Sequence, residues 1–119
     1  MKVVHLNTNL NITSAPYQLH RALLQNGIDS NLLVFNACDL EKAESPKHDL
    51  LYKLKRRAAA KKRDSIMQGY NQNPDMYFTA LPYGMDVSKH SLIISSDVVM
   101  IHWVCGDYLS VEGIGKLLE

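Results

Sequence analysis

The segment from Asp97 to Ser110 constrains the fold of this chain more than any other stretch. An acidic residue precedes a short apolar run, residues 98–101, which ends at the pair His102 and Trp103. A Gly-Asp pair and then a serine suited to capping a helix follow. Such a run is typical of a buried strand of a parallel sheet that carries polar and aromatic groups at its carboxyl end. Ligands of open α/β sheets bind beyond that end of the strands.

Residues 2–36 repeat this order of strand, loop and helix, and they add a second strand. Residues 2–8 predict the first strand and residues 31–35 predict another buried strand. Two strands joined by a helix within about 35 residues indicate a βαβ unit with parallel strands and a right-handed connection. The expected fold class is therefore α/β, a Rossmann-like open and mostly parallel sheet with flanking helices.

The helix between these strands has clear start and stop signals. Ser14 is expected to accept a hydrogen bond from an amide of the first turn, and Gly27 is expected to end the helix. The periodicity predicts one buried stripe, formed by Ala15, Leu19, Ala22 and Leu23.

The middle and the end of the chain predict further elements. Residues 47–67 predict a helix whose apolar arc holds Leu50, Leu51, Leu54 and Ala58. A short strand is expected at 76–81 and a short helix at 87–92. Ser110 is expected to cap a last helix, with its core-facing side formed by Val111, Ile114, Leu117 and Leu118.

Length and composition bound the class of protein. A chain of 119 residues with net charge +1 fits one globular domain and shows no general attraction to nucleic acid. It has neither a membrane-spanning apolar run nor a signal-peptide pattern, so a cytoplasmic location is expected, or one peripheral to the inner face of the membrane. Cys38 and Cys105 are not spaced as in a disulfide framework.

Three stretches together resemble a known family. MKVVHLNTN, APYQLHRALLQNGIDSNLLV and SSDVVMIHWVCGDYLSVEGIGKLL are similar to the start of family-4 retaining glycosyltransferases of the GT-B fold. The most similar members build capsular and other bacterial surface polysaccharides. The resemblance covers residues 1–36 and 95–118.

The resemblance implies transfer of a sugar from a nucleotide-sugar donor to a saccharide or lipid-linked acceptor. It also implies that residues 1–119 form part of the amino-terminal, acceptor-side domain. The carboxyl-terminal domain, which holds the donor in such enzymes, and the catalytic histidine then lie outside these residues. The expectations are therefore no catalytic residue, no cofactor, a nucleotide-sugar donor only for the full-length enzyme, and no sugar transfer by this chain alone. One departure is the loop Asn9–Ser14, which lacks the family's Gly-Gly pair.

The sheet edge supplies the candidate acceptor site. His102 and Trp103 can bind a sugar hydroxyl and stack on a sugar face, or they can pack within the core edge and loop. The loop after the first strand and the turn after Trp103 add amide, hydroxyl and carboxyl groups, which otherwise serve as ordinary loop and turn residues. The full set of candidates is Asn9, Asn11, Thr13, His102, Trp103 and Asp107. His102 and Cys105 alone do not make a metal site, so none is expected.

The helix at 47–67 offers an alternative function of another class. It carries most of the chain's basic residues and can dock a non-catalytic α/β binding module on an anionic membrane or partner. It can equally be a solvated surface helix, and nucleic acid is not expected because no groove-reading motif accompanies it. The candidate residues are Lys53, Arg56, Arg57, Lys61, Lys62 and Arg63.

Overall fold

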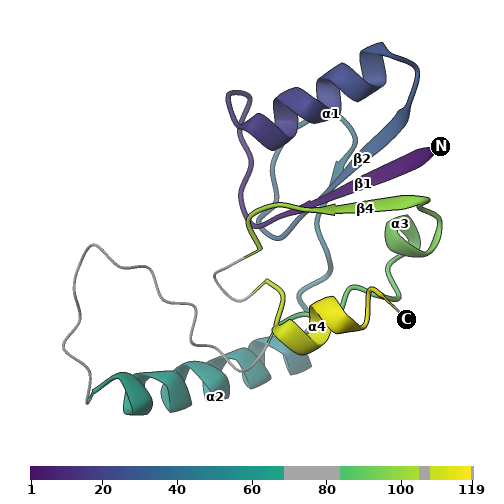
Figure 1. The fold of residues 1–119 in the computed structure, drawn as a ribbon. Coiled ribbons are helices and arrows are strands. Elements are labelled where there is room, and N and C mark those ends of the chain that lie inside the picture. The colour runs from purple at the N-terminus through teal and green to yellow at the C-terminus, as the bar shows by residue number, and fades with distance from the viewer. Residues whose placement is uncertain (69–83, 105–107, 119) are drawn as a thin grey trace. The chain divides into compact units, whose positions relative to one another are not determined.

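The chain forms two compact units in a computed structural model (Figure 1). The structure describes residues 1–68, 84–104 and 108–118, and for Arg63, Ile66 and Met67 it describes the backbone alone. The first unit comprises Met1–Lys47 with Val87–Val104, and the second comprises His48–Asp86 with Cys105–Glu119. Residues 2–36 and the strand predicted at 97–102 thus fall within one unit.

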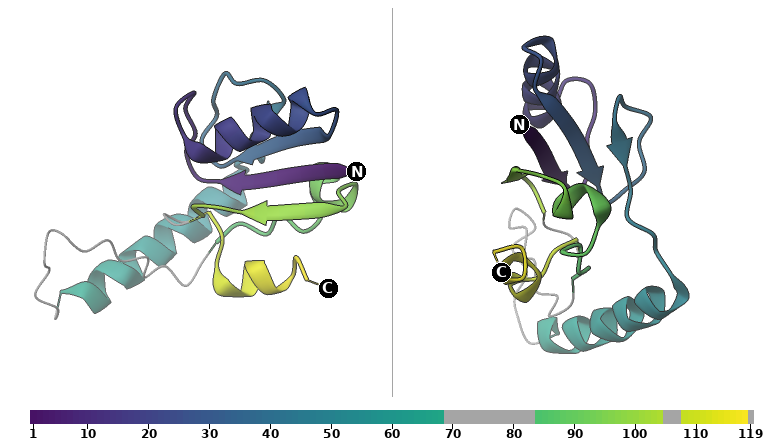
Figure 2. Two further views of the ribbon diagram at one scale, coloured as in Figure 1. Left: turned by 45° about the horizontal axis from the view of Figure 1, so that its top comes forward. Right: turned by 90° about the vertical axis from the view of Figure 1, so that its right-hand side faces the viewer.

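The first unit is built on a four-stranded, all-parallel sheet. Its strands are β1 (Lys2–Asn7), β2 (Asp29–Val34), β3 (Ala43–Glu44) and β4 (Val98–Ile101), in the order β3-β2-β1-β4. Figure 2 shows β2, β1 and β4 side by side. This confirms the expected α/β fold with an open parallel sheet. The strand order reverses direction between β1 and β4, and in such sheets the ligand crevice lies at this reversal.

Strand register decides which side chains share a face of the sheet. His5 pairs with Leu32 on one side and with Met100 on the other. Since alternate residues of a strand share a face, His5, Asn7 and Ser30 lie on the same face. Helix α1 (Ala15–Gln25) packs against β1 and β2. The buried cluster there consists of Tyr17, Leu32 and Val34, with Leu10, Cys38, Leu40 and Ala43 packed around it.

Helix α1 buries a different stripe from the predicted one. Tyr17 and His20 are its buried residues, whereas Ala15, Leu19 and Ala22 are exposed and Leu23 is half-buried. The prediction was wrong because it followed apolar periodicity alone and so left out His20, whose hydrogen-bonding partner in the sheet allows its burial.

The two ends of α1 follow the sequence in part. Ser14 is the N-cap residue, but its side chain makes no cap hydrogen bond and its Oγ instead donates to the Asn11 carbonyl at 2.7 Å. Gly27 has φ of 73°, a left-handed conformation that glycine adopts at little cost. The predicted role of Ser14 as a side-chain cap was therefore wrong, and that of Gly27 is confirmed.

The remaining connections of the first unit differ in detail from the expectations. The polar link after β2 contains the short strand β3, which the sequence did not predict. Helix α3 (Ser91–Ile94) is displaced from the predicted 87–92, and the His90 side chain caps it by accepting from Leu92 N. The strand expected at 76–81 lies outside the described residues.

The second unit contains helix α2 (Leu50–Met67) and helix α4 (Val111–Gly115). Asp49 Oδ1 accepts from Tyr52 N at 2.7 Å and so caps α2, and Tyr52 is buried. The apolar arc predicted for this helix is exposed: Leu50, Leu51 and Leu54 are 73%, 59% and 53% accessible, and Ala58 is exposed as well. The pattern indicated which side chains share one side of the helix, and it left open which side packs.

Helix α4 confirms its predicted start. Ser110 Oγ accepts from Gly113 N at 3.0 Å. Its expected core-facing side is only partly correct, since Ile114 and Leu117 are half-buried while Val111 and Leu118 are exposed. Gly113 is the buried residue of the helix. No helix within the described ranges is both long and apolar enough to cross a bilayer.

Candidate functional site at the carboxyl ends of β1 and β4

Backbone hydrogen bonds hold the carboxyl ends of β1 and β4 together. His102 N donates to the Leu6 carbonyl at 3.0 Å, and Thr8 N donates to the Trp103 carbonyl at 2.7 Å. On the other side of β1, Asn36 N donates to the Thr8 carbonyl at 3.1 Å. The residues that follow β1, β2 and β4 therefore lie at one edge of the sheet, as the sequence predicted for His102 and Trp103.

The predicted loop candidates divide into two groups. Asn9 reaches the chain after β2, because its Oδ1 accepts from Asn36 Nδ2 at 2.6 Å. Asn11 and Thr13 bond with each other instead: Asn11 Oδ1 accepts from Thr13 N at 3.0 Å and from Thr13 Oγ1 at 2.8 Å. Asn9 thus belongs to the sheet edge, whereas Asn11 and Thr13 order their own loop.

The two aromatic candidates after β4 have different environments. Trp103 is 59% accessible and is therefore exposed to solvent. His102 is half-buried. Asp107, the remaining candidate, lies outside the described residues. The exposed indole offers a stacking surface, and the half-buried imidazole of the preceding residue offers a hydrogen-bonding group.

A line of hydrogen bonds runs inward from His102. His102 Nε2 lies 2.9 Å from His5 Nδ1, and His5 Nε2 lies 3.1 Å from Ser30 Oγ. Ser30 Oγ also lies 2.8 Å from His20 Nδ1, and His20 Nε2 lies 3.1 Å from the Glu41 carbonyl oxygen. The His5 and His102 rings stack with centroids 5.2 Å apart. One chain of bonds therefore connects the sheet edge to the loop before β3 through α1.

Burial sets the charge of these imidazoles. His5, His20 and Ser30 are fully buried. Burial, together with the neighbouring His102 and His20 rings, lowers the pKa of His5 to about 4. Burial also lowers the pKa of His20, against the opposing effect of the hydrogen bond to Glu41, and it lowers the pKa of His102. The three rings are neutral at pH 7 as a consequence.

Asn7 carries a polar atom that the fold leaves unsatisfied. Its side chain is buried at the carboxyl end of β1, and Oδ1 has no hydrogen-bond partner among the described residues. Asn7 follows Leu6, which pairs with Ile101, and His102 follows Ile101. Buried acceptors in native proteins are almost always bonded, so this oxygen is an unused acceptor next to the sheet edge.

The sequence pattern did not reveal His5, Ser30 and His20 as site residues. His5 lies within the strand predicted at residues 2–8, and none of the three was among the candidates. The only signal available was a histidine within an apolar strand. Its partners lie far away in the sequence and meet only through the pairing of β1 with β2 and β4.

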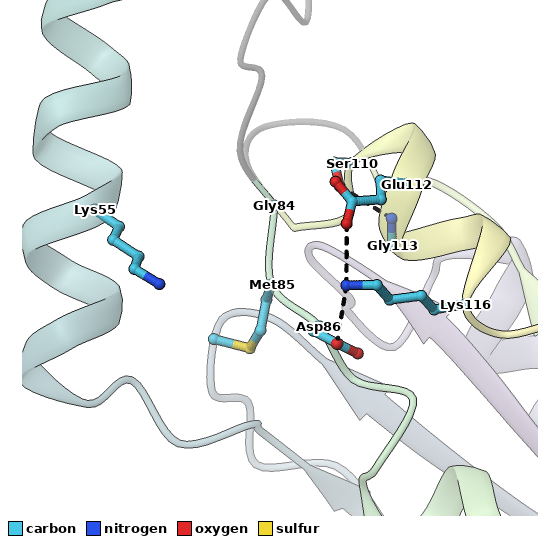
Figure 3. A pocket seen from close by; sticks show the side chains of 8 residues that line it. All are labelled: Lys55, Gly84, Met85, Asp86, Ser110, Glu112, Gly113 and Lys116. Carbon is cyan, nitrogen blue, oxygen red and sulfur yellow. Dashed lines mark hydrogen bonds and ion pairs between the residues drawn. The ribbon is translucent and has the colours of Figure 1, made fainter.

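The second unit contains a separate charged pocket (Figure 3). Lys116 Nζ lies 3.1 Å from Glu112 Oε1 and 3.5 Å from Asp86 Oδ2, so its charge is balanced within the pocket wall. The Lys55 side chain also lines it. Lys116 is thus paired with both carboxylates, and among the described residues that line this pocket no buried side-chain polar atom lacks a hydrogen-bond partner. Within the described ranges, no group of three or more metal-ligating side chains occurs in either unit.

Comparisons with family models, with curated proteins and with solved structures found no match for this chain.

Proposed function

We propose that the first unit is the acceptor-binding part of a retaining glycosyltransferase that acts in cell-surface polysaccharide synthesis. The acceptor, a saccharide or its lipid-linked form, binds at the carboxyl ends of β1 and β4. The observation that carries the proposal is the set of groups at this edge: the exposed Trp103 indole, the half-buried His102 imidazole and the unpartnered Asn7 oxygen.

These groups suit a sugar for chemical reasons. A sugar ring presents an apolar face, which an indole can cover, and hydroxyl groups that both donate and accept hydrogen bonds. His102 Nδ1 has no hydrogen-bond partner among the described residues, and neutral imidazole offers an acceptor there. Asn7 Oδ1 is a second acceptor. An aromatic face and hydrogen-bond acceptors are the kinds of group that bind sugars.

The position within the fold supports the same conclusion. The edge lies where the strand order β3-β2-β1-β4 changes direction, which is the usual ligand position in open parallel sheets. The sequence resemblance to family-4 glycosyltransferases assigns the acceptor to this domain and the nucleotide-sugar donor to another. A test of this proposal therefore measures acceptor binding rather than turnover.

Trp103 makes the binding test direct, because it is the only tryptophan of the chain. The experiment titrates the protein with methyl glycosides of glucose, galactose and N-acetylglucosamine while following tryptophan fluorescence. Binding is expected to change the emission saturably and to protect the indole from iodide quenching. The variant Asn7→Leu should weaken binding by about tenfold, corresponding to one lost hydrogen bond of about 1.4 kcal/mol.

A matched variant separates this effect from a general one. Asn26 follows α1 and is exposed, so Asn26→Leu should leave the titration unchanged. If the folded wild-type protein gives no saturable response with any of the glycosides, recognition of saccharides at this edge is rejected.

A second candidate function rests on the surface of α2. Leu50, Leu51 and Leu54 form an apolar patch that is exposed to solvent. Lys53, Arg57 and Lys61 follow Leu50 by three, seven and eleven residues, so they continue the same side of the helix. Lys62 is exposed too, Arg56 is half-buried, and the side chain of Arg63 is not described.

Leucines bordered by cations suit the interface of an anionic bilayer, where each basic residue contributes about 1 kcal/mol. Sedimentation with vesicles tests this second function. Binding is expected to vesicles that contain phosphatidylglycerol, to weaken with added salt, and to fall in a Leu50→Ser, Leu54→Ser variant. Equal sedimentation with phosphatidylcholine vesicles alone would contradict it.

A further inference from the structure

The bonds that link the three histidines have only one consistent direction in the neutral protein. The Glu41 carbonyl oxygen can only accept, so His20 Nε2 carries a proton and the Nδ1 of a neutral His20 is bare. Nδ1 must then accept from the Ser30 hydroxyl, which uses that hydroxyl's single proton. The tautomer of His20 is thereby fixed by a backbone group.

The same reasoning continues to the edge of the sheet. Ser30 Oγ has already donated, so it accepts from His5 Nε2–H, and His5 Nδ1 is bare. His5 Nδ1 then accepts from His102 Nε2–H. All three histidines are therefore Nε2–H tautomers, and His102 presents an unprotonated Nδ1. The Glu41 carbonyl thus determines, through this chain of bonds, that His102 Nδ1 is a hydrogen-bond acceptor.

One additional proton can reverse the direction of the three hydrogen bonds between these side chains without breaking any of them. When Nδ1 of His102 is protonated, its Nε2 proton passes to His5 Nδ1, and the His5 Nε2 proton passes to Ser30 Oγ. The original hydroxyl proton of Ser30 passes to His20 Nδ1. The positive charge then resides on His20, which still donates to the Glu41 carbonyl. A second proton would place two N–H groups face to face, so the chain holds one proton only.

The surroundings favour charge on His20 over charge on His5. Burial has the largest effect on His20 and lowers its pKa, the carbonyl and the carboxylate of Glu41 oppose this effect, and the Lys42 ammonium adds to it. Lys42 is itself paired with Asp29 at 2.7 Å, and the Tyr17 ring lies 5.9 Å from the His20 ring.

Among the residues that the structure describes, no anionic group raises the pKa of His5 in the same way. His5 lies between two imidazoles and is fully buried. Of the two inner rings, His5 is therefore suited to passing a proton and His20 to holding it.

We propose that His102, His5, Ser30 and His20 form a proton relay that takes up one proton at the sheet edge and stores it on His20. At the edge, His102 Nδ1 takes that proton from solvent, or accepts the hydrogen bond of a hydroxyl group bound there. That ligand role rests on the proposed function, whereas the relay is a property of the four side chains alone.

The relay is tested without a ligand, by nuclear magnetic resonance of the ring nitrogens of the 15N-labelled chain. Spectra are recorded from about pH 8 to about pH 5, the range in which histidines change charge. All three relay histidines are expected to start as Nε2–H tautomers. On acidification, His5 and His102 should change to neutral Nδ1–H tautomers with the same midpoint at which His20 becomes imidazolium.

The tautomer of His5 decides the outcome. If His5 keeps its Nε2–H tautomer while His102 or His20 titrates, or if His5 itself becomes imidazolium, the relay is refuted. The variant Ser30→Ala should keep His5 in one tautomer throughout, and Ser30→Thr, which retains the hydroxyl, should restore the change.

The two proposals can fail separately. A saccharide titration without response leaves the tautomer change of His5 intact, and an absent tautomer change leaves saccharide binding to Trp103 and Asn7 intact. His90, which caps α3 outside the relay, serves as an internal reference and should behave alike in the wild-type and Ser30→Ala proteins.

Discussion

Ser30 shows how much one small side chain can determine in this protein. Its hydroxyl bonds two buried rings, those of His5 and His20, at 3.1 and 2.8 Å. We expect Ser30→Ala to lower the free energy of unfolding by about 2–4 kcal/mol, because it leaves a donor and an acceptor buried without partners. Urea unfolding followed by Trp103 fluorescence measures the loss.

A second serine of the same unit provides the control. Ser96 Oγ donates to the Ile93 carbonyl at 2.8 Å near the end of α3, where the side chain is half-buried. Ser96→Ala should therefore lose about 1 kcal/mol or less. Equal losses in the two variants would mean that the histidine chain adds nothing to stability.

Local sequence pattern predicted the position of the residues at the sheet edge, but it could not predict the buried histidines behind them. His102 and Trp103 stand directly after a recognisable strand, so their position follows from local pattern. His5 and His20 are separated from their partners by many residues, and pattern alone classes them as isolated polar groups. Only the strand register brings Ser30 between them.

Helix α2 shows why helix existence is easier to predict than helix orientation. Its extent agrees with the expected 47–67 within three residues at its start, yet Tyr52, not the leucine arc, is buried. We expect Tyr52→Ala to cost about 3–5 kcal/mol of stability in the second unit and Leu51→Ala less than about 0.5 kcal/mol. Hydrogen exchange of α2 amides measures the loss of stability in each of the two variants.

The outcome that would contradict this assignment is a larger effect of Leu51→Ala than of Tyr52→Ala. That result would place the leucine arc in a core. It would also remove the exposed apolar patch on which the membrane-surface alternative depends.

The segment before α3 and the start of α4 depend on a glycine. A Cβ on Gly84 would overlap the backbone of Leu109 and Ser110, and next to it Met85 N donates to the Tyr108 carbonyl at 2.7 Å. We expect Gly84→Ala to lower the exchange protection of α4 amides at least tenfold, since backbone must move to admit the methyl group. Gly115→Ala meets open space and should raise protection slightly, because alanine favours helix. Similar protection in both variants would refute this close approach.

At the scale of the whole molecule, the parallel sheet was predictable and its completion was not. The strands at 2–8, 31–35 and 97–102 each have a strong apolar pattern, and a βαβ unit implies parallel pairing. The insertion of β1 between β2 and β4 depends on contacts between distant segments. The two-residue strand β3 is too short to leave any pattern. The candidate site depends on the first of these, because it lies at the carboxyl ends of β1 and β4.

The histidine chain also links the stability of the molecule to pH. Burial lowers the pKa of His5 to about 4 and lowers those of His20 and His102, whereas each is about 6.5 in the unfolded chain. Below about pH 6.5 the unfolded state therefore binds more protons than the folded state, and acidification favours unfolding. The stabilisation is complete above that pH and is lost as the pH falls towards about 4.

The expected result is a free energy of unfolding that declines from about pH 7 to about pH 5. Near pH 5 the unfolded state should bind about two more protons than the folded state, because the folded relay can take up one of the three. Urea unfolding at a series of pH values measures the slope of this decline. His5→Gln removes one titrating ring and should make the slope shallower. A protein whose stability stays constant or rises over this range would show that the three imidazoles are not held neutral in the fold. The proton relay would then lose its starting state.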